Sequence, residues 1–121
     1  MSDVLIIDDD RPTRAAIRAA LENAGFDVGE AENGRVALDA LEAGASPDLL
    51  LLDLDMPVMD GYELLEHLRE NPRLVGLPVV VVSAFEYDGR LLRSQGYVKK
   101  PLRADQVVAI ARTWSRGRAR A

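Results

Sequence analysis

The sequence predicts an open, doubly wound α/β fold, in which a five-stranded parallel sheet carries helices on both faces. Short aliphatic runs alternate along the chain with segments whose apolar residues recur at helical spacing. Three of the runs, at residues 4–7, 49–52 and 79–82, are unbroken, which suits strands that are buried on both faces. Crossovers between parallel strands are right-handed, so successive strand–helix units build a single sheet.

Two weaker segments complete the predicted sheet. Residues 26–31 alternate apolar and polar side chains, which favours an edge strand, and Tyr97 and Val98 form the last candidate. Only thirteen residues, 84–96, connect this candidate to the preceding strand, and a parallel crossover needs about a dozen or more. We therefore expect a helix of at most one or two turns at residues 88–94, and we expect residues 85–95 to be mobile and poorly helical.

Four longer segments have the apolar spacing and the end signals of helices. They are residues 12–24, the stretch from Asn33 to Gly44, the stretch from Asp60 to Pro72, and the stretch from Leu102 to Trp114. Gly25 is placed to stop the first helix, Asn33 can cap the second, and Asp60 can cap the third. Trp114 falls on the apolar stripe of the last helix, where we expect it to anchor that helix.

Composition bounds the class of protein. The chain has 121 residues, a formal charge of −5, 48% hydrophobic residues and no cysteine, which fits one globular domain without disulfides or cysteine-bound zinc. The negative charge argues against whole-surface attraction to nucleic acid or anionic lipid. No signal peptide is evident and every aliphatic run is too short to cross a membrane, so a cytoplasmic location is expected.

One domain is expected over residues 1–116, followed by a short basic tail at residues 117–121. The last ten residues contain four arginines and no acid, so the rest of the chain has eleven basic and twenty acidic residues, a charge of −9. The tail is too short to be a DNA-binding output domain. A frayed, solvated end is its simplest interpretation.

The residues that follow the predicted strands should carry the function, because ligands of an open parallel sheet bind beyond the carboxyl ends of its strands. Asp8 and Asp9 follow the first strand and Asp53 follows the third. Ser83 follows the fourth strand and Lys100 the fifth. Three acids, a hydroxyl and an ammonium group are therefore expected at one edge of the sheet.

Such a group of acids needs positive charge, since two like charges about 4 Å apart repel by roughly 4 kcal/mol at an effective dielectric constant of 20. Lys100 supplies one charge against three, and a divalent cation would balance the remainder. Carboxylates without histidine or cysteine favour Mg²⁺ over zinc. An aspartate beside Mg²⁺, a lysine and a hydroxyl is a suitable covalent phosphoryl acceptor.

Four motifs in this order resemble those of response-regulator receiver domains. They are Leu5-Ile6-Ile7-Asp8-Asp9, Leu52-Asp53-Leu54-Asp55-Met56-Pro57-Val58-Met59-Asp60-Gly61, Val82-Ser83-Ala84 and Lys100-Pro101. The resemblance covers nearly the whole chain and implies a flavodoxin-like sheet with strand order 2-1-3-4-5, like that of a chemotaxis regulator. The 84–96 crossover is about one helical turn shorter than the corresponding crossover in this family, so its helix is expected to be shortened.

The resemblance also implies residue roles. Asp53 would accept a phosphoryl group from a phosphohistidine on a sensor histidine kinase or a histidine phosphotransfer protein. Asp8, Asp9 and Asp53, with the backbone carbonyl of Asp55, would hold Mg²⁺.

Three further roles follow from the same resemblance. Ser83 and Lys100 would contact the phosphoryl oxygens, and Tyr97 would be the aromatic switch that turns inward when the Ser83 hydroxyl moves toward the phosphate. Asp55 and Phe85 occupy positions that influence hydrolysis of the acyl phosphate. We expect Phe85→Ala to change the lifetime of the phosphorylated form more than the phosphorylation rate.

The expected function is that of a stand-alone receiver, which switches the binding of a downstream effector protein and is no enzyme beyond its own phosphorylation and autodephosphorylation. A receiver belonging to a larger signalling protein is one alternative. A small phosphatase of the haloacid dehalogenase type, using Asp53 and Asp55, is another, although that class expects an acidic pair after the lysine and only Asp105 follows Lys100. A pseudo-receiver that serves only as a scaffold is disfavoured by the complete set of site residues.

Several of these residues also have plainer interpretations. Asp8, Asp9 and Asp10 alone would suit a solvated turn before a helix, whose N-terminus favours negative charge. Tyr97 fits core packing as well as a switch. His67, the single histidine, falls among charged residues and is expected at the surface rather than as a phosphodonor.

Overall fold

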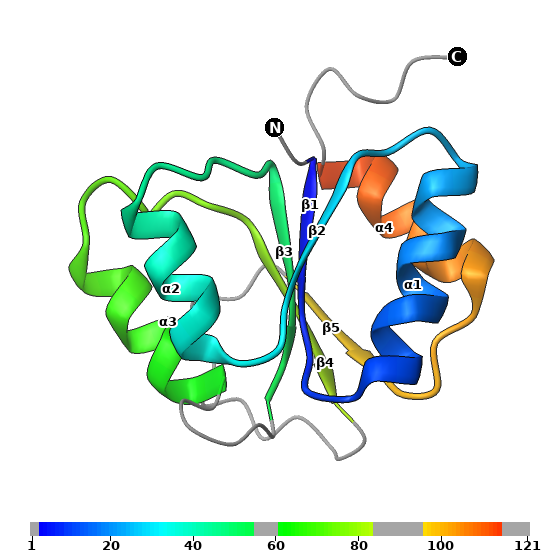
Figure 1. Cartoon of the computed structure of the whole chain (residues 1–121), viewed down its shortest axis with the longest axis horizontal. Helices are drawn as coiled ribbons and strands as arrows, with labels where there is room; N and C mark the ends of the chain where they lie inside the picture. The colour runs from blue at the N-terminus through cyan, green and yellow to red at the C-terminus, as the bar shows by residue number, and fades with distance from the viewer. Residues whose placement is uncertain (1–2, 55–60, 84–95, 115–121) are drawn as a thin grey trace.

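The computed structural model describes residues 3–54, 61–83 and 96–114 (Figure 1). Strands and helices alternate over most of this length. The elements are β1 (Val4–Ile7), α1 (Arg11–Asn23), β2 (Val28–Ala31), α2 (Gly34–Glu42), β3 (Leu49–Asp53), α3 (Gly61–Glu70), β4 (Val79–Ser83), β5 (Gly96–Lys99) and α4 (Ala104–Trp114). The predicted helix at residues 88–94, the Asp60 cap and the 117–121 tail lie outside the described residues.

The five strands form one parallel sheet in the order β2-β1-β3-β4-β5, which confirms the predicted strand order. Figure 1 shows α1 and α4 on one side of the sheet and α2 and α3 on the other. Every residue of β1, β3 and β4 is buried. Burial on both faces explains why these strands are unbroken aliphatic runs, whereas the edge strand β2 exposes Glu30.

The sheet separates two hydrophobic cores, because successive side chains of a strand point to opposite faces. One core joins alternate strand residues such as Ile7 and Leu52 to α2 and α3. The other joins Ile6 and Leu51 to α1 and α4. Trp114 packs against this second core and is only partly buried, which confirms its expected role as an anchor of the last helix.

Local interactions fix the ends of the first two helices. The side chain of Asp10 accepts a hydrogen bond from the Thr13 N–H at the start of α1, and Asn33 accepts one from the Val36 N–H at the start of α2. Gly25, just beyond α1, has φ of 95°, a left-handed conformation that glycine adopts without strain. Both N-caps satisfy backbone donors that a helix leaves without internal partners.

Observed boundaries differ from the predicted ones by a few residues. β3 and β4 each continue one residue further, so that Asp53 and Ser83 are the last residues of their strands. The edge strand β2 begins at Val28 rather than at Phe26, whose buried ring packs into the core from the preceding loop. No helix among the described residues combines the length and apolar character needed to cross a membrane.

Candidate functional site

Strand register brings the predicted site residues to one edge of the sheet. Ile7 pairs with Leu52, so Asp8 follows β1 at the level where Asp53 ends β3. Ser83, at the end of β4, pairs with Lys99, and Lys100 comes next. The structure therefore places Asp8, Asp53, Ser83 and Lys100 at the carboxyl ends of four neighbouring strands, as the sequence predicted.

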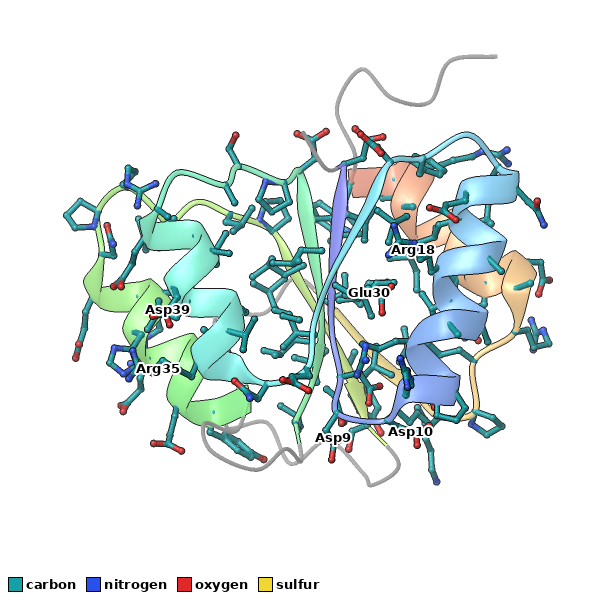
Figure 2. The ribbon with its side chains drawn as sticks, viewed as in Figure 1. Asp9, Asp10, Arg18, Glu30, Arg35 and Asp39 are labelled. Atoms are coloured by element: carbon teal, nitrogen blue, oxygen red, sulfur yellow. The ribbon has the colours of Figure 1, made fainter. Side chains whose placement is uncertain are left out.

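Three carboxylates form a compact cluster at this edge. Asp8, Asp9 and Asp53 each offer a carboxylate oxygen, and these oxygens lie within 4.8 Å of one another. Asp8 and Asp53 are 2% and 6% exposed, whereas Asp9 is open to solvent. Figure 2 shows Asp9 next to Asp10 at this edge of the sheet. The cluster is thus buried at its base and accessible from one side.

Lys100 bridges two of the three acids. Its Nζ lies 3.1 Å from Asp8 Oδ2 and 3.6 Å from Asp53 Oδ1. Burial lowers the pKa of the Lys100 ammonium, but the hydrogen bond to Asp8 and the charges of Asp53 and Asp8 outweigh it and raise that pKa above its ordinary value of 10.5. The Lys100 N–H also donates to the Ser83 carbonyl at 2.7 Å, which joins the loop after β5 to the end of β4.

Several hydrogen bonds hold Asp8 in place. Its Oδ1 accepts a hydrogen bond from the Asp10 N–H at 2.9 Å, while its Oδ2 accepts one from Lys100. Its backbone N–H donates to the Ala31 carbonyl of β2 at 3.1 Å. These contacts fix both the backbone and the carboxylate of a buried charged residue, which would otherwise be costly to keep in the fold.

Asp10 does not join the cluster. Its carboxylate accepts hydrogen bonds from the hydroxyl and the backbone N–H of Thr13, which lower its pKa below the ordinary value of 3.8. The interpretation of an acid at a helix N-terminus is therefore correct for Asp10. Asp8 and Asp9, by contrast, lie in the group of acids around Asp53.

Gly61 has a structural role that sequence reasoning did not identify. A Cβ at this position would lie 2.8 Å from the Asp53 carbonyl oxygen and 2.8 Å from the Leu54 Cα. The Gly61 N–H donates to the Leu54 carbonyl at 3.0 Å, so the start of α3 packs directly against the end of β3. Only glycine allows this approach without a shift of the backbone that carries Asp53.

Two other predicted residues lie on the neighbouring strands β4 and β5. Ser83 is 3% exposed at the end of β4, and Tyr97 on β5 is half-buried and packs against the core beneath α2 and α3. Asp55 and Phe85 lie outside the described residues. His67 is exposed on α3, which confirms its expected surface position.

The cluster fits a small divalent cation. All three side chains offer hard oxygen ligands, and two oxygens on opposite sides of a Mg²⁺ ion are roughly 4 Å apart. Since the observed oxygens lie within 4.8 Å, small side-chain movements would bring them onto such an ion. Three carboxylates and one ammonium leave a formal charge of about −2, which a divalent cation balances.

Comparisons with known proteins agree with this geometry. A family model described as the response regulator receiver domain matches residues 4–112. An uncharacterized 14.6 kDa protein in the sodA1 3′ region of Leptolyngbya boryana is 39% identical over 105 residues, which cover 83% of this chain and 79% of that protein. Response regulator Rre1 of Synechocystis sp. is 38% identical over 117 residues, 90% of this chain and 49% of that protein, so the chain spans about half its length.

Solved structures show the same fold. The response regulator protein TrrA of Thermotoga maritima, in complex with Mg²⁺-BeF, matches with a TM-score of 0.82 and 26% identity. The match covers 94% of this chain and 99% of that chain.

Proposed function

The chain belongs to the response regulator receiver domain family of two-component signalling, and from this premise we propose that it accepts a phosphoryl group on Asp53 in a Mg²⁺-dependent reaction. The position of Asp53 carries the proposal. Asp53 is the last residue of the central strand β3. One of its carboxylate oxygens lies within 4.8 Å of carboxylate oxygens of Asp8 and Asp9, and the Lys100 Nζ lies 3.6 Å from Asp53 Oδ1. A carboxylate nucleophile beside a cation and acidic ligands suits phosphoryl transfer.

In the proposed step, a carboxylate oxygen of Asp53 attacks the phosphorus of a phosphohistidine. The new P–O bond forms as the P–N bond breaks, and the electron pair of that bond stays on the imidazole nitrogen of the donor. The product is an acyl phosphate on Asp53 and a dephosphorylated histidine. Little covalent help is needed from other groups, because phosphoryl transfer depends chiefly on alignment and on stabilising charge.

Lys100 and Ser83 would supply that stabilisation from the neighbouring strands. The Lys100 ammonium already lies between Asp8 and Asp53, within reach of oxygens added to Asp53. The Ser83 side chain ends β4, the strand that pairs with β3. We propose that both donate to the phosphoryl oxygens, and that movement of Ser83 is coupled to an inward turn of Tyr97.

Asp8, Asp9 and Asp53, together with the carbonyl of Asp55, would hold the Mg²⁺ ion. When bound, the ion neutralises charge on the transferring phosphoryl group and on the carboxylates around it. Asp8 and Asp9 then serve to position the ion rather than to react. Asp8 is suited to this task because Lys100 and the Asp10 N–H fix its carboxylate.

The proposed partners follow from the chemistry of the acceptor. The donor is a phosphohistidine of a sensor histidine kinase or a histidine phosphotransfer protein, and the phosphorylated form binds a downstream effector protein. We propose that residues 1–116 act as one receiver unit in the cytoplasm, and that the chain catalyses no reaction beyond its own phosphorylation and dephosphorylation. The 117–121 tail has no assigned part in the phosphoryl step.

The test is phosphoryl uptake from a small donor. Wild-type protein, Asp53→Asn and Asp39→Asn are each incubated with acetyl phosphate, with Mg²⁺ or with EDTA, and analysed by intact-mass spectrometry. We expect one added phosphoryl group on the wild type with Mg²⁺, none with EDTA and none on Asp53→Asn. Asp39, an exposed acid on α2, is the matched control, and its variant should be phosphorylated like the wild type.

Two outcomes would overturn the proposal. An Asp53→Asn variant that still gains one phosphoryl group places the acceptor elsewhere, and a wild type that gains none with Mg²⁺ is not a phosphoacceptor. Multiple turnover of p-nitrophenyl phosphate by the wild type would instead support a phosphatase of the haloacid dehalogenase type.

A further inference from the structure

We propose that Arg14, on the first turns of α1, is a positioning residue for the two aspartates that follow β1. The inference rests on the proposed Mg²⁺ site and adds a residue outside the cluster that determines how well the site binds the ion. Arg14 offers no ligand of its own. It acts on the peptide bond that joins Asp8 to Asp9.

The contact with that peptide is direct. Arg14 Nη1 donates a hydrogen bond of 2.7 Å to the backbone carbonyl oxygen of Asp8. This carbonyl belongs to the peptide unit between Asp8 and Asp9, so its orientation sets the relative directions of the two side chains. A charged donor makes such a bond about twice as strong as a neutral one.

An ion pair with Glu30 holds Arg14 in place. Arg14 Nε donates to Glu30 Oε1 on β2 at 2.9 Å, and the Arg14 side chain is only 13% exposed. Glu30 also pairs with Arg18, which in turn pairs with Glu22 at 3.0 Å. Figure 2 shows Arg18 of α1 and Glu30 of β2 in the region between these two elements. Glu30 thereby fixes the Arg14 guanidinium through Nε, while Nη1 of the same group donates to the Asp8 carbonyl oxygen.

Both contacts require a guanidinium group. Nε and Nη1 are separate donors in one rigid plane, and here they point to acceptors on different elements, Glu30 on β2 and the carbonyl after β1. The ammonium group of a lysine keeps the charge but is a single point on a flexible stem. Arg14→Lys therefore separates the charge of Arg14 from its positioning contact.

Charge and positioning predict opposite effects on Mg²⁺ binding. If Arg14 acted through its charge alone, its removal would tighten binding, because one cation fewer would oppose the ion. If Arg14 positions the aspartates, its removal weakens binding, since residues that orient metal ligands typically contribute tenfold or more to affinity. The sign of the change therefore distinguishes the two roles.

The experiment measures the Mg²⁺ dissociation constant by isothermal titration calorimetry on wild type, Arg14→Ala, Arg14→Lys and Arg35→Ala. We expect Arg14→Ala to bind Mg²⁺ about tenfold more weakly, and Arg14→Lys to be weakened although its charge is kept. Arg35 on α2 pairs with exposed Asp39 at 3.6 Å. Arg35→Ala is the matched control, because it also removes one arginine but none of the contacts with the Asp8 carbonyl, and it should bind Mg²⁺ like the wild type. Urea unfolding in EDTA verifies that each variant is folded. If Arg14→Ala does not fold, the Mg²⁺ affinity of Arg14→Lys alone tests the proposal.

The outcomes separate this inference from the function on which it rests. A wild type that does not bind Mg²⁺, or an Asp53→Asn variant that binds it equally well, refutes the proposed site and the role of Arg14 with it. A wild type that binds Mg²⁺ with the expected dependence on Asp53, together with Arg14 variants that bind equally or more tightly, refutes the positioning role alone.

Discussion

Lys100 offsets part of the negative charge of the acid cluster within the protein itself. Its ammonium contacts Asp8 at 3.1 Å and Asp53 at 3.6 Å, and both carboxylates are buried. Two buried like charges repel strongly unless a cation lies between them. The same ammonium is proposed to contact the phosphoryl group. It would therefore stabilise the unphosphorylated fold and also stabilise the charge of the phosphoryl group on Asp53.

Replacing Lys100 gives a pH-dependent prediction. Because the folded-state pKa of Lys100 is raised above 10.5, its stabilising contribution is complete below about pH 10.5 and is lost as pH rises through the folded-state value. We expect Lys100→Gln to be less stable than the wild type at neutral pH, by about 1–3 kcal/mol. The difference should shrink above pH 10.5, as measured by urea unfolding in EDTA.

The neighbouring lysine supplies the control for this prediction. Lys99→Gln removes the same charge from an exposed position on β5. A stability difference for Lys100→Gln that stays constant up to pH 12, or that Lys99→Gln reproduces, would contradict the assignment of the pH dependence to the contacts of Lys100 with Asp8 and Asp53.

Sequence reasoning found the residues of the cluster but not those that support it. Asp53, Ser83 and Lys100 were predictable because each comes at the end of an aliphatic run, and the ends of parallel strands meet at one edge. Arg14 and Gly61 carry no such signal. Arg14 is one of several arginines on a helix, and the role of Gly61 depends on a backbone approach that exists only in the folded chain.

At the scale of elements, the junction between β3 and α3 controls the position of Asp53. The start of α3 touches the backbone of Asp53 and Leu54, which leaves no room for a side chain at Gly61. We expect Gly61→Ala to lower the free energy of unfolding by about 1–3 kcal/mol, because the added methyl group meets backbone atoms that cannot move aside locally. It should also slow phosphorylation of Asp53 by acetyl phosphate.

Gly76 provides a matched control for this substitution. A Cβ at Gly76 meets nothing within 4 Å, so Gly76→Ala should leave the unfolding free energy and the phosphorylation rate close to those of the wild type. Urea unfolding and intact-mass time courses measure both effects. Equal behaviour of the two variants would show that the close approach at Gly61 has no consequence.

The pairing of α1 with β2 gives a second prediction at this scale. Hydrogen bonds from Arg18 and Arg14 lower the pKa of Glu30 below its ordinary value of 4.5. A lowered pKa means that the stabilising contribution is present above about pH 4.5 and is lost as pH falls through the folded-state value. We expect Glu30→Gln to be less stable than the wild type at pH 7 by up to about 1 kcal/mol, since such ion pairs are partly solvated.

Thermal unfolding between pH 3 and pH 7 measures this difference, which should decline toward the acidic end. Glu66→Gln, on the exposed side of α3, removes the same charge away from these arginines. A difference that persists unchanged at pH 3 would mean that Glu30 acts through packing rather than through its charge.

The elements themselves were predictable because periodicity and end signals agree along the chain. Unbroken aliphatic runs became the central strands, and Asn33 and Gly25 mark helix ends where they were expected. The boundaries were less accurate because tertiary packing decides them. Phe26 suits a strand by its residue type, yet it fills the core from a loop, while pairing with β4 extends β3 to Asp53.

At the scale of the whole molecule, the site opposes the stability of the fold that builds it. Two hydrophobic cores on either side of the sheet stabilise the domain, and its central strands end in clustered negative charge. The formal charge of −5 for the whole chain understates this local concentration. Such a molecule should gain stability from a bound divalent cation and from the loss of one clustered carboxylate.

Asp9 tests this relation between site and fold, because it is the exposed member of the cluster. In EDTA, Asp9→Asn should be more stable than the wild type by roughly 1 kcal/mol, since one of the clustered charges is removed. Mg²⁺ at ten times its dissociation constant should stabilise the wild type by about 1.4 kcal/mol, because it binds the folded state only. The gain should be smaller for Asp9→Asn, whose site has lost a ligand. The difference in stability between Asp9→Asn and the wild type should therefore shrink or change sign when the ion is added. Urea unfolding in EDTA, in Mg²⁺ and in NaCl of equal ionic strength measures these differences, and an equal gain in NaCl would reduce the effect of Mg²⁺ to general screening.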